Sequence, residues 1–360
     1  MITGSPRGTR SSSRRLALQF ISGMQKHGDY EFEEFVCTEH DLHPCRGCLA
    51  CWSTVDGHCV QNDDMQQLFR SYVQADIVAW AFPNYFYGLP STVKMVLERL
   101  LPIEYPMLAE INPCHTKHKR RYDLEHQRYL TFVTCGLFNR DGNINGIQAV
   151  FSQYYGAQCE QIYCTEGDLF RHDAMRAYTA PYFAALERAG AEYAAGGITP
   201  ETRAILERPM LPMEQYLEFT NLNTLMREPD ETAEHFRMRR IRALMGLIRL
   251  TYRPEWVRSG ASVLEVCLTD HDYACQFRMD GSGCTLVDDP AKFVPYDLKV
   301  LAPLRFFNAR GTLQQAAVKN DKKNVDFYLL VAMTQRCARS GRPKTMSFEA
   351  PPSKPPHRKG

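Results

Sequence analysis

The amino-acid sequence predicts a doubly wound α/β domain with a parallel sheet, followed by a smaller α+β domain. The apolar run at residues 77–82 (IVAWAF) ends at Pro83 without alternation, as in a strand buried on both faces of a parallel sheet. Helical apolar spacing precedes the run at 65–73 and follows it at 93–101. Alternation of strands and helices over residues 1–195 indicates the first domain, and hairpin-linked strands after residue 262 indicate the second.

The remaining elements of the first domain follow in order. Only Met1, Ile2 and Thr3 precede Gly4, whereas a strand usually has about five residues, so we expect a truncated or mis-assigned start. The next helix carries Leu16, Phe20 and Met24 on its inward face. Further strands are predicted at 30–37, 129–134 and 158–164, and a further helix at 172–195.

Composition limits the class of protein. The net charge of the 360-residue chain is +2, which indicates neither nucleic acid nor an anionic membrane as a partner. No apolar run approaches the roughly 18 residues of a transmembrane helix, and the first residues lack the apolar core of a signal peptide. A cytoplasmic location is therefore expected. There, the thirteen cysteines are better explained as metal ligands, redox groups or small buried side chains than as disulfides.

The loop GSPRGTRSSS (residues 4–13) lies between the first strand and the first helix. Its backbone N–H groups, hydroxyls and helix N-terminus together suit a phosphate group. The loop lacks the Gly-Lys-Ser/Thr ending of a P-loop and the GxGxxG of a dinucleotide fold. Alone, it is a weak signal, because loops rich in Ser, Gly and Arg are usually solvated turns.

Two further segments follow strands at the same edge of the predicted sheet. FPNYFYGLP (82–90) offers three aromatic rings and an Asn that could contact a flat ring and its heteroatoms. The alternative is a surface loop whose aromatic side chains pack on their neighbours. TCGL (134–137) follows the next strand.

Four stretches in this order, GSPRGTRSSS, HCVQNDDMQQL, ADIVAWAFPNYFYGLPSTVKMVLERL and TFVTCG, resemble the flavodoxin-like NAD(P)H-dependent FMN reductase family. The resemblance implies a five-stranded sheet in flavodoxin order, bound FMN, an NAD(P)H donor and a homodimer. Since the flavin carries the redox chemistry, we name no catalytic side chain. By position, the phosphate contacts are Ser5, Arg7, Ser11, Ser12 and Ser13. The ring contacts are Pro83, Asn84, Tyr85, Phe86 and Tyr87, with Thr134, Cys135 and Gly136 on the far side.

The segment HPCRGCLACWSTVDGHC (43–59) holds Cys45, Cys48, Cys51 and Cys59. Closely spaced cysteines can supply thiolates to a [4Fe–4S] cluster, and this spacing resembles the iron–sulfur flavoproteins of the same superfamily. Zinc is a second interpretation, although C-x2-C-x2-C is cramped for a tetrahedral site. Free thiols in a structured loop are the third.

The second half of the chain begins with a helical connector at 196–235. The following basic amphipathic helix indicates either a membrane-surface helix or, more commonly, a domain helix with a solvated basic face. Strands are predicted at 263–268, 273–279, 284–288 and 296–301, with a hairpin turn at 280–283 and helices at 304–318. Residues 236–335 resemble the sterol-carrier-like SCP2 fold, which implies a possible apolar tunnel. The Pro/Lys-rich tail at 336–360 is predicted to be disordered.

These observations lead to one functional hypothesis and two alternatives. The hypothesis is an FMN-binding oxidoreductase that passes electrons from NAD(P)H to a flavin, quinone or protein acceptor, with a [4Fe–4S] cluster at the four cysteines as a candidate relay. The first alternative is an electron-transfer flavoprotein or apolar-ligand carrier without turnover of its own, using the SCP2-like domain. The second is a degenerate domain, weakened by the short first strand, that binds no flavin.

Overall fold

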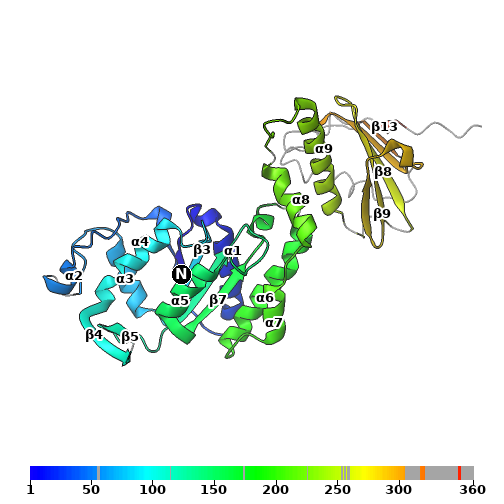
Figure 1. Ribbon diagram of the computed structural model, residues 1–360. Coiled ribbons are helices and arrows are strands. Elements are labelled where there is room, and N and C mark those ends of the chain that lie inside the picture. The colour runs from blue at the N-terminus through cyan, green and yellow to red at the C-terminus, as the bar shows by residue number, and fades with distance from the viewer. Residues whose placement is uncertain are drawn as a thin grey trace, which may run out of the picture. The chain divides into compact units, whose positions relative to one another are not determined.

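The computed structural model describes residues 1–304 apart from 55–56, 114, 173–174, 225, 253, 255–256 and 258–259, together with residues 317–320 and 348–349. The chain divides into two compact units (Figure 1). The first comprises Met1–Arg171 and Tyr178–Met210, and the second comprises His172–Ala177 and the described residues from Leu211 onward.

A five-stranded parallel sheet forms the centre of the first unit, in the order β2-β1-β3-β6-β7. Numbered along the chain, this is order 2-1-3-4-5, the flavodoxin arrangement, which confirms the predicted fold class of this region. The strands are β1 (Ile2–Thr3), β2 (Phe35–Val36), β3 (Ile77–Pro83), β6 (Arg128–Thr134) and β7 (Cys159–Cys164).

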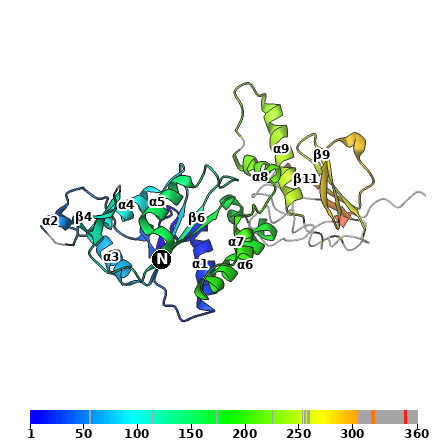
Figure 2. The ribbon, with the colours of Figure 1, turned by 60° about the horizontal axis from the view of Figure 1, so that its bottom comes forward.

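Helices cover both faces of this sheet, and Figure 2 shows β6 between α5 on one side and α1 and α6 on the other. The unit's helices are α1 (Ser12–Gln25), α2 (Ala50–Ser53), α3 (Met65–Gln74), α4 (Ser91–Arg99), α5 (Asn145–Tyr155), most of α6 (Arg176–Ala194) and α7 (Pro200–Glu207). Short 3-10 turns lie at Gly8–Arg10, Cys37–Glu39, Leu101–Ile103, Gly156–Gln158 and Gly167–Arg171.

The side chains of β3 alternate between two hydrophobic cores. Trp80 and Phe82, both fully buried, pack in the core that includes α3, α4 and α5. Ala79 and Ala81 face the core that includes α1 and α6, where their small size lets these helices approach the sheet closely. Burial of each large apolar side chain contributes roughly 1.5–3 kcal/mol, so β3 is a major source of stability.

Helices α1 and α6 cross at two glycines. A Cβ added to Gly23 would lie 1.9 Å from the carbonyl oxygen of Glu187, and one added to Gly190 would lie 1.9 Å from that of Phe20. Both positions therefore need glycine because the backbones themselves are in contact.

Two parts of the first unit differ from the sequence-based expectation. The strand predicted at 30–37 is reduced to Phe35–Val36, and residues 30–34 form no strand. An antiparallel hairpin that we did not predict, β4 (Glu104–Asn112) with β5 (His115–Arg120), lies between α4 and β6. It exposes Met107, Leu108 and Ile111.

The second unit contains a sheet in the order β10-β9-β8-β11-β12-β13. Its strands are β8 (Ser262–Leu268), β9 (Ala274–Asp280), β10 (Gly283–Val287), β11 (Leu298–Ala302), β12 (Ala317–Asn320) and β13 (Phe348–Glu349). Its helices are α8 (Met213–Thr224) and α9 (Ala233–Leu250), and a 3-10 turn covers Pro290–Lys292. The predicted hairpin turn is confirmed, since Asp280 Oδ1 accepts hydrogen bonds from the backbone N–H groups of Ser282 and Gly283.

The basic helix α9 packs as a domain helix within this unit. Ile241, Met245 and Ile248 are fully buried in the core that includes β8 and β9. Three of its arginines form ion pairs: Arg239 with Glu231, Arg242 with Asp288 and Arg249 with Glu218. No helix in the described part of the chain is both long and apolar enough to cross a bilayer.

Several predictions for the second half are corrected or stay predictions. The helical prediction is wrong at residues 317 and 318, because they belong to β12, which pairs antiparallel with β11. Most of the predicted helices at 304–316 lies outside the described residues. So does the 336–360 tail, except for β13, which pairs in parallel with β12. The domain limits and the resemblance to the SCP2 fold stay predictions.

Gly23→Ala is expected to lower the free energy of unfolding by roughly 1–3 kcal/mol, because a methyl group must displace the α6 backbone. This cost outweighs the gain of up to about 1 kcal/mol that alanine brings inside a helix. Urea unfolding followed by circular dichroism measures the change. Gly88→Ala is the control, since its Cβ would lie 3.9 Å from the carbonyl oxygen of Phe86, an ordinary van der Waals distance. Equal stability of the Gly23→Ala variant and the wild type would contradict the close crossing.

Candidate functional site

Three loops leave the carboxyl ends of neighbouring strands, where ligands bind in open α/β sheets. The first residue of each loop donates a backbone hydrogen bond to the adjacent strand. Gly4 donates to Ala81, Asn84 to Thr134 and Cys135 to Cys164, at 2.8–2.9 Å. All three predicted flavin-contacting segments therefore lie on one edge of the sheet.

The serine loop, residues 4–13, connects β1 to α1. Ser5, Ser11, Ser12 and Ser13 are all buried, and the hydroxyls of Ser11 and Ser13 lie 2.7 Å apart. Ser11 caps α1 by accepting a hydrogen bond from the backbone N–H of Arg14. Gly8 adopts a left-handed φ of 53°, and a Cβ there would lie 2.6 Å from Thr38 Oγ1. The loop is thus a compact, ordered turn.

Arg7 supplies the observation that suits an anion at this loop. Among the described residues, its Nε is buried and has no hydrogen-bond partner. A buried guanidinium N–H without an acceptor is costly, and a phosphate oxygen would satisfy it. The first turn of the 14-residue helix α1 adds the partial positive charge of a helix N-terminus. These groups fit the phosphate of FMN.

An ion pair fixes the first turn of α1 beside the serine loop. Arg14 Nε and Nη2 donate to the two carboxylate oxygens of Glu34 at 2.7 and 2.6 Å, and Thr3 Oγ1 donates to the same carboxylate. Burial alone would raise the pKa of Glu34, but the hydrogen bonds from Arg14 and Thr3 outweigh it and hold the pKa below its usual value.

The aromatic loop, residues 83–90, contains a strained two-residue turn. Tyr85 and Gly88 exchange backbone hydrogen bonds of 3.1 and 3.0 Å, and the residues between them, Phe86 and Tyr87, have φ values of 50° and 62°. The left-handed region costs L-residues roughly 1–2 kcal/mol each. The Phe86 side chain is 99% exposed and that of Tyr87 58%, so the turn presents its rings to solvent rather than to neighbouring side chains.

Asn84 joins the aromatic loop to the two loops beside it. Its Nδ2 donates to the carbonyl of Asn143 at 2.6 Å and approaches Cys135 Sγ at 3.7 Å. Its Oδ1 is buried and, within the described residues, lacks a donor. Because an amide oxygen is an acceptor only, this atom suits a ring N–H of a bound ligand. The pattern fits a flavin ring at this edge.

The third predicted segment lies at the end of β6. Thr134 and Cys135 are buried and Gly136 is exposed. Cys135 accepts a backbone hydrogen bond from Gly167, and its sulfur accepts one from the N–H of Leu137. Burial raises the pKa of the Cys135 thiol, which makes it a poor nucleophile at neutral pH.

The four predicted metal ligands lie between β2 and α3 in residues 44–61, which we call the thiol loop. Cys48 is exposed, Cys51 is buried, and Cys45 and Cys59 are half-buried. Burial raises the pKa of Cys51, and the other three thiols add to this effect, so all four are electrostatic neighbours. However, no group of three His, Cys, Asp or Glu side chains in the described residues, which omit 55–56 of this loop, is arranged to hold a metal. As placed, these side chains do not fit a cluster.

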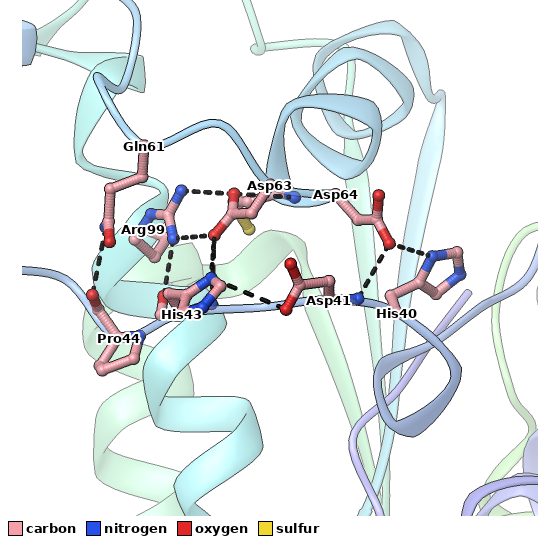
Figure 3. Close-up of polar contacts among 9 residues, drawn as sticks. His40, Asp41, His43, Pro44, Gln61, Asp63, Asp64 and Arg99 are labelled. Carbon is pink, nitrogen blue, oxygen red and sulfur yellow. Dashed lines mark hydrogen bonds and ion pairs between the residues drawn. The ribbon is translucent and has the colours of Figure 1, made fainter.

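A polar cluster lies where the thiol loop begins and ends (Figure 3). Arg99, from the end of α4, donates to both carboxylate oxygens of Asp63 and to the carbonyl of His43. In the same cluster, the Asp64 carboxylate accepts a hydrogen bond from the backbone N–H of Asp41 and pairs with the His40 ring.

Sequence reasoning missed some of these contributors. Asn143, whose carbonyl anchors Asn84, lies 59 residues away in a polar loop without a distinguishing pattern. The sequence does show the Asp63-Asp64 and Glu98-Arg99 pairs, but nothing in it indicates that Arg99 and Asp63 meet.

Residues 1–112 match the model of the family described as NADPH-dependent FMN reductase. Among curated proteins, an iron–sulfur flavoprotein of Archaeoglobus fulgidus is 32% identical over 101 residues, which are 28% of this chain and 44% of that protein. An iron–sulfur flavoprotein of Methanocaldococcus jannaschii is 28% identical over 102 residues, 28% of this chain and 51% of that protein. The chain thus spans about half the length of the curated relatives it matches.

Among solved structures, an FMN-dependent NADH-azoreductase from Bacillus anthracis in complex with FMN is similar with a TM-score of 0.40 and 12% identity. The similarity covers 54% of this chain and 97% of that one. An NAD(P)H:quinone oxidoreductase from Methanothermobacter marburgensis gives a TM-score of 0.38 and 15% identity, covering 53% and 94%.

Glu34→Gln is expected to destabilise the protein by about 1.5–3 kcal/mol at pH 7, the range for hydrogen bonds to charged groups. The folded pKa of Glu34 lies below its unfolded value of about 4.3, so the wild-type advantage is complete above that pH. It disappears as the pH falls through the folded pKa. Urea unfolding at pH 7, 5 and 3 measures the difference, with the exposed Glu31→Gln as control. A difference that grows in acid would contradict the assignment.

Proposed function

We propose that the chain is an FMN-dependent oxidoreductase that takes electrons from NAD(P)H and delivers them to a flavin, quinone or protein acceptor. The observation that carries the proposal is Asn84 Oδ1, a buried acceptor where the aromatic loop meets the loop after β6, to which no described residue donates a hydrogen bond. The match of residues 1–112 to the NADPH-dependent FMN reductases supports it independently. Bound FMN would supply the acceptance and release of electrons.

The chain's own residues would bind and orient that cofactor. Arg7 and the first turn of α1 would hold the phosphate, and Asn84 would accept a hydrogen bond from the ring. The exposed rings of Tyr85, Phe86 and Tyr87 would cover a flat ligand and reduce its contact with water. The raised pKa of Cys135 argues against a thiolate in the reaction.

Steady-state oxidation of NADH and NADPH by the purified protein, with FMN, quinone and artificial acceptors, tests the proposal. An FMN-loaded protein that consumes NAD(P)H with any of these acceptors supports it. An electron-transfer protein or ligand carrier would show no turnover, and a colourless protein that takes up no FMN would exclude the flavin function altogether.

The iron–sulfur assignment of Cys45, Cys48, Cys51 and Cys59 stays a separate prediction, and no step of the proposed reaction uses it. The names of the two archaeal relatives favour it, whereas the placement of the thiols does not. Iron and sulfide analysis of anaerobically purified protein tests it: Cys48→Ala is expected to remove iron and leave FMN bound. Unchanged iron in this variant rejects the assignment. The homodimer also stays a prediction, measurable by light scattering.

Arg7→Ala is expected to weaken FMN binding roughly tenfold to a hundredfold, the effect of losing one charge-assisted hydrogen bond. Binding of riboflavin, which lacks the phosphate, should not change. Quenching of flavin fluorescence on titration measures both affinities. Asn84→Ala is the matched contrast, because it should weaken FMN and riboflavin equally. If Arg7→Ala weakens both ligands to the same extent, Arg7 does not contact the phosphate.

A further inference from the structure

Both ends of the thiol loop are held by one buried guanidinium, that of Arg99 (Figure 3). Arg99 Nη1 donates to the carbonyl of His43, two residues before Cys45, at 2.6 Å. The same Nη1 donates to Asp63 Oδ2 at 2.6 Å, and Nη2 donates to Asp63 Oδ1 at 2.8 Å. Asp63 lies four residues after Cys59, so one side chain joins both ends of the cysteine-bearing segment.

Direct contacts between the two ends complete this closure. The backbone N–H of His43 donates to Asp63 Oδ2 at 3.1 Å, and Gln61 Nε2 donates to the carbonyl of Pro44 at 3.1 Å. The Asp63 side chain has no exposed surface and that of Arg99 only 2%. A buried bidentate pair of this kind depends on the planar fork of arginine, which lysine cannot reproduce.

The helix that carries Arg99 is α4, which begins at Ser91, directly after the aromatic loop. Arg99 thus ties the thiol loop to the helix that follows the proposed ring-binding segment.

Contacts also hold the interior of the loop. Trp52 Nε1 donates to the carbonyl of Leu101, and its ring packs against His118 with the ring centroids 4.8 Å apart. The N–H of Gly57 donates to the carbonyl of Cys51, and the short helix α2 lies between residues 44 and 61. Arg99 therefore fixes the two ends of a loop whose middle has contacts of its own.

We infer that Arg99 is the positioning residue of the thiol loop: it closes the loop at both ends and anchors these ends to α4. The four thiols are thereby kept in one small region before any ligand binds them. This role depends on the contacts of Arg99, Asp63 and His43 and is independent of whether FMN binds.

Per-cysteine alkylation kinetics of the full-length Arg99→Lys variant test the inference. The protein is first treated anaerobically with chelator and reductant to remove bound metal, then labelled with iodoacetamide and analysed by peptide mass spectrometry. Lysine keeps the charge but loses the fork, so Cys51 and Cys59 are expected to react about tenfold faster through local opening. Cys164 and Cys275, buried elsewhere, and the exposed Cys48 should react at wild-type rates.

The matched control is Arg203→Lys. Arg203 forms the same kind of bidentate pair with Glu160, at 3.0 and 2.9 Å, on α7 and β7. This variant should leave the reactivity of Cys51 and Cys59 unchanged.

Two results would overturn the inference: unchanged rates for Cys51 and Cys59 in Arg99→Lys, or a parallel rise at Cys164 and Cys275, which indicates general loosening. If Arg99→Lys does not fold, Gln61→Ala takes its place in the experiment. This variant removes the side-chain hydrogen bond to the Pro44 carbonyl and leaves Arg99 intact. A selective rise at Cys59 in that variant supports closure of the loop ends, and no rise overturns it. FMN titration of the same samples separates the questions, since failure of the wild type to bind FMN rejects the proposed function and leaves the thiol result intact.

Discussion

Backbone hydrogen bonds between the parallel strands continue beyond the strand ends, and the placement of every candidate binding loop depends on them. Gly4, Asn84 and Cys135 each donate one such bond to the neighbouring strand before the chain turns away. The origin of each loop is therefore set by the sheet rather than by a ligand. This is the preorganisation that a binding site needs, because side chains on rigid elements are placed more accurately than those on free loops.

The register of that sheet depends in turn on the unequal faces of β3. Large rings on one face and alanines on the other mean that a one-residue slip would place Trp80 and Phe82 where α1 and α6 approach closely. Packing on both faces thus holds the strand in the position that aligns the three loops.

The parts of this arrangement that the sequence could predict are those encoded locally. The uninterrupted apolar run predicted β3, and helical periodicity predicted α1, α3 and α4. Residue types at the strand ends indicated the serine and aromatic loops, and the family resemblance assigned their residues to a flavin. Residues 30–34 misled the strand prediction because β1, the neighbouring strand, has only two residues, which pair with Phe35 and Val36 alone. The β4–β5 hairpin was missed because Pro106, Pro113 and a run of His and Lys obscure its alternation.

The closure of the thiol loop shows why contacts between distant side chains could not be predicted from the sequence. Asp63 precedes a helix and is typical of a capping residue in sequence, yet its carboxylate binds an arginine 36 positions later. Such a pairing depends on the three-dimensional path of α3, β3 and α4 together. The sequence shows how many cysteines the loop contains and how they are spaced. It does not show how their side chains are arranged in space.

The turn at Phe86 and Tyr87 has a consequence for how this protein could change under selection. Two bulky residues in the left-handed region make the unliganded fold less stable than it could be, and Asn-Gly at these positions would relieve the strain. Selection for heat resistance alone would thus tend to replace both rings, whereas their proposed role of covering a flat ligand would require them. Stability of the fold and the proposed ligand contact therefore place opposite demands on these two residues.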